Sequence, residues 1–194
     1  MFENITPPAK RAIMAASLRL FSTRGVDGVT VRDIAAASAF TNPALFRHFA
    51  SKEALAQALY VECYRHLADV LRDDSPPDFE SWLLAALNEI VRRPEAVNYV
   101  LEHLRRQFPA LPADVRKENL PSLVRRRLIR ERDEGRLRAD IDVPLTGVLV
   151  LGTLSQLARA MHFAPGSIDA PAYARGINVM LMYGIGPPVS GEVS

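Results

Sequence analysis

Apolar residues recur every three to four positions along most of this chain, a spacing that places them on one face of an α-helix. The long apolar–polar alternations that are typical of half-buried strands do not occur in the sequence. Prolines, glycines and short polar stretches separate the periodic segments. We therefore predict an all-α protein of about nine helices. Beyond three helices near the N-terminus, of which the last two form a short pair, the expected spans are residues 52–71, 79–93, 95–108, 115–134, 143–161 and 171–183.

The short helical pair begins at a threonine that suits a helix N-terminus. Thr30 precedes the run Val31–Ser38, and Asp33 follows three residues later, so the two side chains are expected to form a capping box. The alanines of this run favour a helix and permit the close approach of a neighbouring helix. The chain then turns through Ala39 and Phe40.

The second helix of the pair is predicted to have one buried and one open face. Thr41 is expected to cap it, and Pro43 is tolerated in its first turn because N–H groups there lack partners within the helix. Leu45 and Phe49 lie four residues apart and are expected to face the core. The layout indicates a helix-turn-helix, whose second helix enters the major groove of DNA. The positions left pointing away from the core are Asn42, Ala44, Phe46 and Arg47.

The side chains at these open positions are of the types that bind base edges and phosphates in DNA. The amide of Asn42 can pair with both polar atoms of an adenine edge, and Pro43 offers apolar surface to a thymine methyl. Short donors at helix ends bind phosphate. Each residue alone also has a purely structural explanation, but their common spacing favours DNA binding. The predicted contacts are Thr30, Arg32, Thr41, Asn42, Pro43, Ala44, Phe46, Arg47, His48 and Lys52.

Charge is unevenly distributed between the two parts of the chain. The whole has 24 Lys and Arg against 22 Asp and Glu, a net charge of +2. Residues 1–52 hold seven of these cations and three of the acids, a net of +4, so the remainder is slightly acidic at −2. A basic N-terminal part is the electrostatic signature of a DNA-binding domain.

Residues 12–59 resemble the DNA-binding domain of TetR-family transcriptional regulators. The similar motifs are Leu20-Phe21, Gly25, the run from Thr30 to Ala35 (TVRDIA) and the run from Leu45 to Leu55 (LFRHFASKEAL). The resemblance implies that Arg32, Asn42, Pro43 and Ala44 face bases, while Thr30, Thr41, His48 and Lys52 hold phosphates. It further implies a dimer whose last two helices pair with their copies, and a small-molecule pocket in the body of the protein.

Two positions depart from the pattern of that family. Ala39 stands where the family commonly has glycine, so a left-handed backbone there is expected to be mildly strained. Phe46 stands where tyrosine is common, so one hydroxyl bond to phosphate is missing. We expect DNA binding to survive both changes. The predicted domains are a helix-turn-helix at 1–52, an effector-binding and dimerisation domain at 53–186, and a tail at 187–194.

The predicted helix 143–161 is apolar nearly all round, which indicates burial on more than one side. Its length approaches that of a membrane span, but Gln156 and Arg159 interrupt it, so we expect no membrane insertion. Leu154 and Leu157 are candidates to face a second copy of the chain. A monomer would otherwise expose a contiguous apolar patch.

The effector is predicted to be apolar or aromatic, because the body offers aromatic side chains. Each of these is also a natural core residue. The candidate ligand-binding residues are Tyr60, His66, Trp82, Tyr99, His103, Phe108, Met161 and Phe163.

Enzyme and metal chemistry find little support in the sequence. Cys63 and His66 lie three residues apart, but no third orienting group is evident, and a lone cysteine on such a helix is usually a buried hydrophobe. No Glu-x-x-His pair exists, so a di-metal bundle site is not expected. The arginines between positions 125 and 132 are interpreted as a solvated helix face. A single cysteine and the lack of a signal peptide favour a reducing cytoplasm. We expect no enzyme activity, cofactor or metal.

The combined prediction is a dimeric repressor that binds a palindromic operator and is released by a small molecule. Two alternatives stay open. One is an activator, or a regulator that needs its ligand to bind DNA. The other is a small helical enzyme that has kept a vestigial DNA-binding part.

Overall fold

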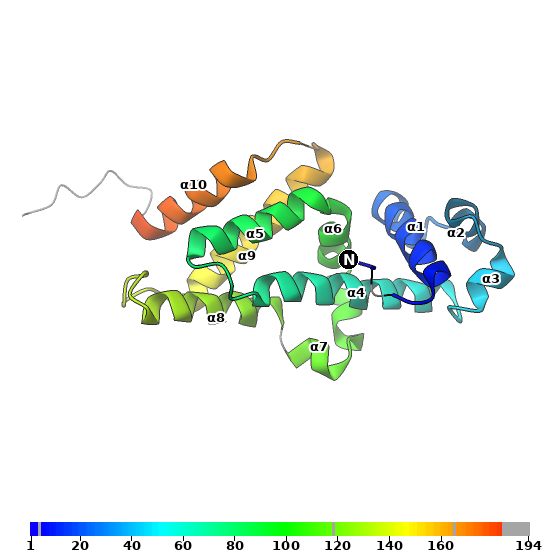
Figure 1. The fold of residues 1–194 in the computed structure, drawn as a ribbon, viewed down its shortest axis with the longest axis horizontal. Coiled ribbons are helices and arrows are strands. Elements are labelled where there is room, and N and C mark those ends of the chain that lie inside the picture. Colours follow the sequence, from blue (N-terminus) through cyan, green and yellow to red (C-terminus); the bar gives the residue numbers. More distant parts are fainter. Residues whose placement is uncertain (4, 118, 165, 184–194) are drawn as a thin grey trace, which may run out of the picture. The chain divides into compact units, whose positions relative to one another are not determined.

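The structure is a computed structural model that describes residues 1–3, 5–117, 119–164 and 166–183. Every regular element within these residues is a helix (Figure 1). The predicted tail, 187–194, lies outside the described residues. The helices are α1 (Pro8–Arg24), α2 (Val31–Ser38), α3 (Asn42–Phe46), α4 (Lys52–Arg72), α5 (Phe79–Arg92), α6 (Pro94–Gln107), a 3₁₀ turn η1 (Phe108–Ala110), α7 (Ala113–Lys117), α8 (Leu120–Asp133), α9 (Val143–Phe163) and α10 (Ala170–Tyr183).

These helices form two compact units that do not follow the order of the chain. The first unit comprises residues 1–69 and 93–119, and the second comprises residues 70–92 and 120–194. Consequently α6 and α7 fold with the N-terminal helices, while α5 folds with α8, α9 and α10.

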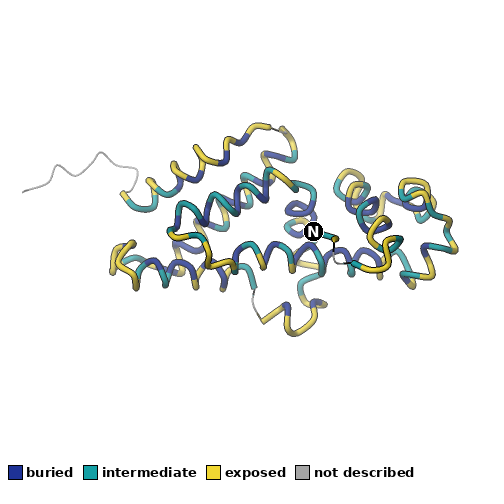
Figure 2. Tube along the Cα trace, viewed as in Figure 1, coloured by how far each residue is buried: buried dark blue, intermediate teal, exposed yellow. Residues whose placement is uncertain are grey.

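The first unit is built around α1, which packs against α2 and α6. Its core contains side chains from each of the first four helices, and Figure 2 shows their buried positions in dark blue. These core residues include Ile13, Met14, Phe21, Ile34, Leu45, Leu55 and Leu59.

The second unit is organised by α5, which packs mainly against α10 and also against α9 and α8. Asp78 caps α5 next to the predicted helix start at residue 79, since its Oδ1 accepts a hydrogen bond from the Ser81 N–H at 2.8 Å. Asp142 caps α9 in the same manner through the Leu145 N–H at 2.9 Å. Both caps use groups within one helical turn, which is why sequence spacing locates these helix starts.

The single helix predicted for residues 115–134 is wrong, because the chain forms α7 and α8 there. Pro121 lies in the first turn of α8. A proline ring clashes with the carbonyl four residues earlier and lacks an N–H, so a continuous helix through Pro121 is disfavoured, whereas a helix start near it is not.

The arginines of α8 are only partly a solvated face. Arg127 is fully buried and pairs with the equally buried Glu131, one turn later, at 2.6 Å. Arg136 donates to the other carboxylate oxygen of Glu131 at 2.5 Å. The interpretation of the run as a solvated surface is therefore wrong for Arg127, which the fold needs in order to neutralise a buried carboxylate.

Candidate nucleic-acid interface

The start of α2 is organised by the predicted capping box. The Thr30 hydroxyl accepts a hydrogen bond from the Asp33 N–H at 3.2 Å, and the Asp33 carboxylate accepts one from the Thr30 N–H at 2.8 Å. Arg24, at the end of α1, pairs with the same carboxylate at 2.6 Å. The backbone bond from Thr30, its hydroxyl and the Arg24 guanidinium together lower the pKa of Asp33. This carboxylate therefore stays ionised and holds α2 against α1.

The turn between α2 and α3 has the left-handed backbone expected at Ala39, with φ 59° and ψ 32°. Its N–H bonds the carbonyls at the end of α2, and the Phe40 N–H bonds that of Ala35 at 3.0 Å. A residue with a Cβ in this region costs about 1–2 kcal/mol, which the helix-ending bonds offset in part. The turn ends α2 and leads the chain into α3, which packs against α2.

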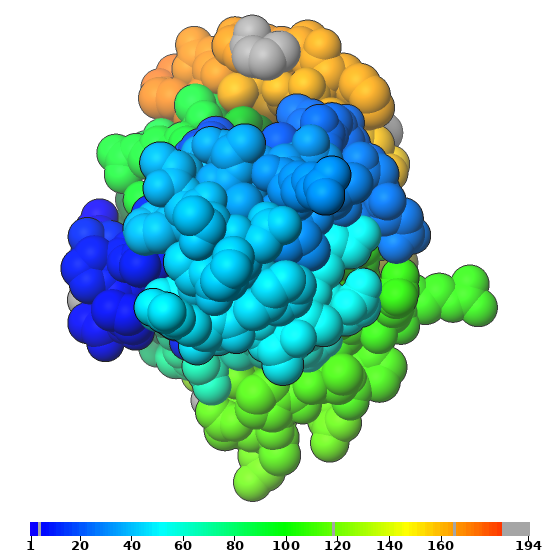
Figure 3. All heavy atoms as spheres, turned by 90° about the vertical axis from the view of Figure 1, so that its right-hand side faces the viewer, coloured from blue at the N-terminus to red at the C-terminus, as the bar shows by residue number. Residues whose placement is uncertain are grey.

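Helix α3 exposes the face that was predicted to read DNA. The Thr41 hydroxyl caps it by accepting the Ala44 N–H at 3.3 Å, and Leu45 and Phe49 are buried as expected. Figure 3 looks onto this face, with α2 and α3 in light blue to cyan. The predicted contacts that are exposed are Thr30, Arg32, Thr41, Pro43, Phe46 and Arg47, and those that are half-buried are Asn42, Ala44, His48 and Lys52.

Lys52 takes a position that its sequence neighbours do not reveal. Its Nζ donates hydrogen bonds to the carbonyl oxygens of Val26 at 2.8 Å and Val29 at 3.0 Å. Both carbonyls belong to the loop between α1 and α2. The partners lie 26 and 23 residues earlier in the chain, so no local pattern could have indicated this contact.

Three of the candidate effector residues gather in the core of the first unit. The ring of Tyr99 lies 4.7 Å from that of His103 and 6.4 Å from that of Tyr60, and it stacks on Phe21 of α1 at 6.1 Å. Burial raises the pKa of both tyrosine hydroxyls and lowers the pKa of His103. Phe108 contacts the neighbouring ring of Tyr64. This cluster joins α1, α4 and α6.

The other candidates are not part of that cluster. His66 is half-buried on α4 in the first unit. Trp82, in the second unit, stacks on Phe79 at 5.5 Å and donates its Nε1–H to the Leu71 carbonyl at 3.2 Å, so it serves the core. Met161 is buried in the second unit, whereas Phe163 is 79% exposed.

Helices α9 and α10 each present an exposed apolar stripe. The residues recur at helical spacing, and Figure 2 shows exposed positions repeating along α10. Leu154 is buried within the unit and Leu157 is half-buried, so the expectation that Leu154 faces a partner is wrong. On a helix that is apolar all round, only packing decides the open side. The exposed large residues are Leu145, Val148, Leu149 and Phe163 on α9, and Tyr173, Val179, Met180 and Tyr183 on α10.

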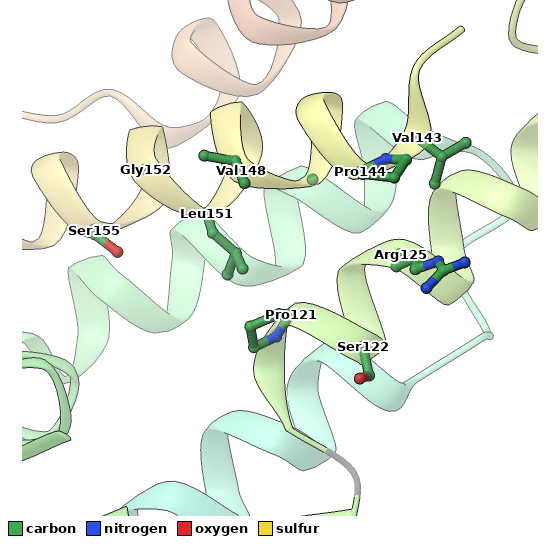
Figure 4. Close-up of a pocket in the computed structure, with 10 residues that line it drawn as sticks. Pro121, Ser122, Arg125, Val143, Pro144, Val148, Leu151, Gly152 and Ser155 are labelled. Carbon is green, nitrogen blue, oxygen red and sulfur yellow. The ribbon is translucent and has the colours of Figure 1, made fainter. Parts of the chain in front are cut away.

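A groove of about 490 Å³ runs between α8 and α9 (Figure 4). Val143, Val148 and Leu151 of α9 line it, and Pro121 of α8 forms the opposite wall. Apart from its chain neighbours and the nearby backbone of α9, no atom lies within 4 Å of the place where a Cβ on Gly152 would stand, so the groove is open there. Val148 belongs both to the groove and to the exposed stripe of α9.

Length and composition alone would allow α9 to cross a membrane, and 33% of the 18-residue apolar stretch that meets this criterion is buried within the protein. Core helices of water-soluble proteins have the same length and apolar composition. Here α9 packs against both α5 and α8, and Arg159 interrupts its apolar character near the C-terminal end.

Among the described residues, no group of three or more His, Cys, Asp and Glu side chains lies close enough together to hold a metal ion. Cys63 is fully buried, and burial raises the pKa of its thiol. A thiol in that setting is a packing group.

Comparisons with known proteins agree with the geometry of the first unit. Residues 13–59 match the sequence model of a family described as bacterial regulatory proteins, tetR family. A transcriptional repressor of Mycobacterium tuberculosis is 31% identical over 98 residues, which cover 50% of this chain and 52% of the repressor. The chain thus matches about half the length of that relative.

Two further similarities extend beyond the first unit. The transcriptional regulator TtgR of Pseudomonas putida is 28% identical over 179 residues, covering 81% of each protein. The crystal structure of a regulatory protein of the tetR family from Rhodococcus has a TM-score of 0.74 with 19% identity, covering 93% of this chain and 98% of that one. The latter similarity concerns the fold alone.

Proposed function

We propose that this chain is a member of the TetR family of bacterial transcriptional regulators, and that it is a dimeric repressor released from a palindromic operator by a small molecule. The observation that carries the proposal is the outer face of α2 and α3. There the caps and buried anchors of a helix-turn-helix leave Arg32, Pro43, Phe46 and Arg47 exposed. We place the protein in the cytoplasm, where its DNA lies.

The proposed division of labour on DNA follows from the type of each side chain. Asn42 opens α3, where side chains of a recognition helix reach base edges, and its amide suits adenine. Arg32 and Arg47 are exposed cations that can pair with guanine or phosphate. Phe46, 48% exposed, provides an apolar surface for sugar or a thymine methyl.

The proposed dimer is supported by the apolar stripes of α9 and α10. Large contiguous apolar surfaces on a folded chain mark sites of association. The occupant we propose for the α9 stripe and the adjoining groove is a second copy of the chain, because a palindromic operator requires two-fold symmetry. Exposed Gly152 and Gly176 permit the close approach of helices.

The proposed effector is an apolar or aromatic molecule that binds in the helical body. It has to bind more tightly to a conformation that does not fit DNA, since only a difference in affinity shifts the equilibrium. An activator, or a regulator that needs its ligand to bind DNA, is the alternative within the family. The relatives are transcriptional regulators, which argues against an enzyme.

The deciding experiment measures DNA binding by fluorescence anisotropy, with duplexes tiled across the region upstream of the gene. We expect one palindromic duplex to bind at least about 1,000-fold more tightly than random DNA at physiological salt. A panel of apolar and aromatic compounds is then added to the complex, and one that releases the duplex identifies the effector class. Equal affinity for every duplex would contradict an operator-specific regulator, and tighter binding with a compound would favour the ligand-requiring alternative.

A further inference from the structure

The peptide bond between Val29 and Thr30, at the entrance to α2, is held from both sides by charged side chains. Its carbonyl oxygen, on Val29, accepts a hydrogen bond from Lys52 Nζ at 3.0 Å. Its N–H, on Thr30, donates to Asp33 Oδ2 at 2.8 Å. Lys52 Nζ also donates to the Val26 carbonyl at 2.8 Å. A lysine from α4 and an aspartate from α2 therefore clamp one peptide unit.

The loop that carries this peptide has little freedom of its own. Gly25 ends α1 with a left-handed φ of 69°. A Cβ on Gly28 would lie only 2.3 Å from the backbone oxygen of Arg24, so the loop passes too close to α1 for any other residue. The Val29 side chain is buried in the core of the unit. The loop thus brings two carbonyl groups to a point where a single ammonium group binds both.

The clamp continues into a line of alternating charge. Arg24 pairs with Asp33, Asp33 accepts the Thr30 N–H, and the carbonyl of the same peptide accepts from Lys52. Charge-assisted hydrogen bonds are roughly twice as strong as neutral ones, and neighbours in a chain of bonds polarise one another. The lowered pKa of Asp33 is consistent with this arrangement.

We infer that Lys52 is a positioning residue, which sets the orientation of α2 and α3 relative to the start of α4, and not a phosphate contact. Because α3 packs on α2, a displacement of the 29–30 peptide moves the recognition pair. Helix α4 begins at Lys52, so the clamp joins the start of this helix to the entrance of α2. The inference rests on the proposed function in DNA binding.

The first test compares Lys52→Met with Arg47→Ala in the full-length protein, since Arg47 is an exposed cation on α3. Affinities for the operator and for random duplex DNA are measured over a range of salt. Loss of a phosphate contact weakens binding to both DNAs equally. It also reduces by about one the salt slope, which is the slope of log affinity against log salt concentration. We expect that result for Arg47→Ala. For Lys52→Met we expect an unchanged slope and a loss of operator preference of about tenfold, the effect of one charge-assisted bond.

The second test uses Asp33→Ala, for which electrostatics and positioning predict opposite signs. Removing an acid from a DNA-binding surface strengthens binding if charge alone matters. If the clamp positions α2, the same substitution weakens operator binding by about tenfold and leaves the salt slope unchanged. Stronger binding of Asp33→Ala, or a slope reduced by one for Lys52→Met, would overturn the inference.

Hydrogen exchange supplies a readout that does not require DNA. Lys52→Met is expected to increase the exchange rate of the Thr30 amide at least about tenfold, because the peptide loses one of its two charged partners. Arg47→Ala should leave that rate unchanged. Equal protection of this amide in Lys52→Met and the wild type would refute the clamp. A wild-type protein that binds no DNA would refute the proposed function while leaving this measurement intact.

Discussion

Tyr60 and Tyr99 offer a matched pair of buried hydroxyls with opposite expected effects on stability. The hydroxyl of Tyr99 donates to the Ala56 carbonyl in α4 at 3.0 Å. The described residues give the Tyr60 hydroxyl no hydrogen-bond partner, although it is equally buried. Substituting phenylalanine at either position removes one oxygen and leaves the ring in place, so the packing of the aromatic cluster is retained.

The magnitudes follow from the partners of each hydroxyl. Tyr99→Phe loses a neutral hydrogen bond and should lower the free energy of unfolding by about 1 kcal/mol. Burying a hydroxyl without a partner costs about 1–3 kcal/mol in mutational data, so Tyr60→Phe should raise the free energy of unfolding by about 1 kcal/mol or more. The two variants should therefore differ by about 2 kcal/mol, which exceeds the error of a denaturation experiment.

Urea unfolding of the full-length protein, followed by far-UV circular dichroism, measures both values. Fluorescence of Trp82, the single tryptophan, reports on the second unit and shows whether the two units unfold together. The slope of free energy against urea should stay constant in both variants, since neither changes the surface exposed on unfolding. Equal destabilisation by the two substitutions would show that Tyr60 has a partner and would refute the reasoning.

Three further predictions concern DNA reading, assembly and pH. Asn42→Ala should relax the preference at one base pair and cost about 1–3 kcal/mol on the operator alone; an equal loss on random DNA would exclude base reading. Val148→Arg should convert a dimer to a monomer in sedimentation, because an unpaired charge would be buried in the interface, whereas Ala139→Arg on an exposed loop should not. Burial holds the pKa of His103 below its usual value near 6.5, so folding favours the neutral imidazole. The contribution of His103 to the free energy of unfolding is therefore fully present above about pH 7 and is lost as the pH falls through the folded-state pKa. His103→Gln should flatten that acid-side decline in thermal melts.

Local interactions are the part of this structure that could be predicted from the sequence. The capping box of Thr30 and Asp33 and the cap by Asp78 each join groups three residues apart, so spacing alone locates them. The burial of Leu45 and Phe49 also follows from local pattern, whereas the left-handed turn at Ala39 was expected from the family resemblance. The resemblance to a family added the expectation that these helices face DNA.

Two segments carry a local signal that the surrounding composition obscures. Pro121 is visible in the sequence and marks the start of α8, but the apolar pattern on either side of it favoured one continuous helix. Arg127 stands within a run of arginines whose composition suggests solvent, yet its spacing of four residues from Glu131 is compatible with a buried ion pair. In both segments the structure depends on the position of one residue, which the overall composition does not show.

The tertiary structure alone decided which residues meet across large separations in the chain. Lys52 binds carbonyl groups 23 and 26 residues earlier, and no periodicity contains that information. Val148 is exposed while Leu154 is buried, although both lie on a helix that is apolar on every side. A side chain's hydrophobicity states its preference for burial, but the surfaces available to bury it come from other helices. The open face of α9 is therefore determined by where α5 and α8 pack against it.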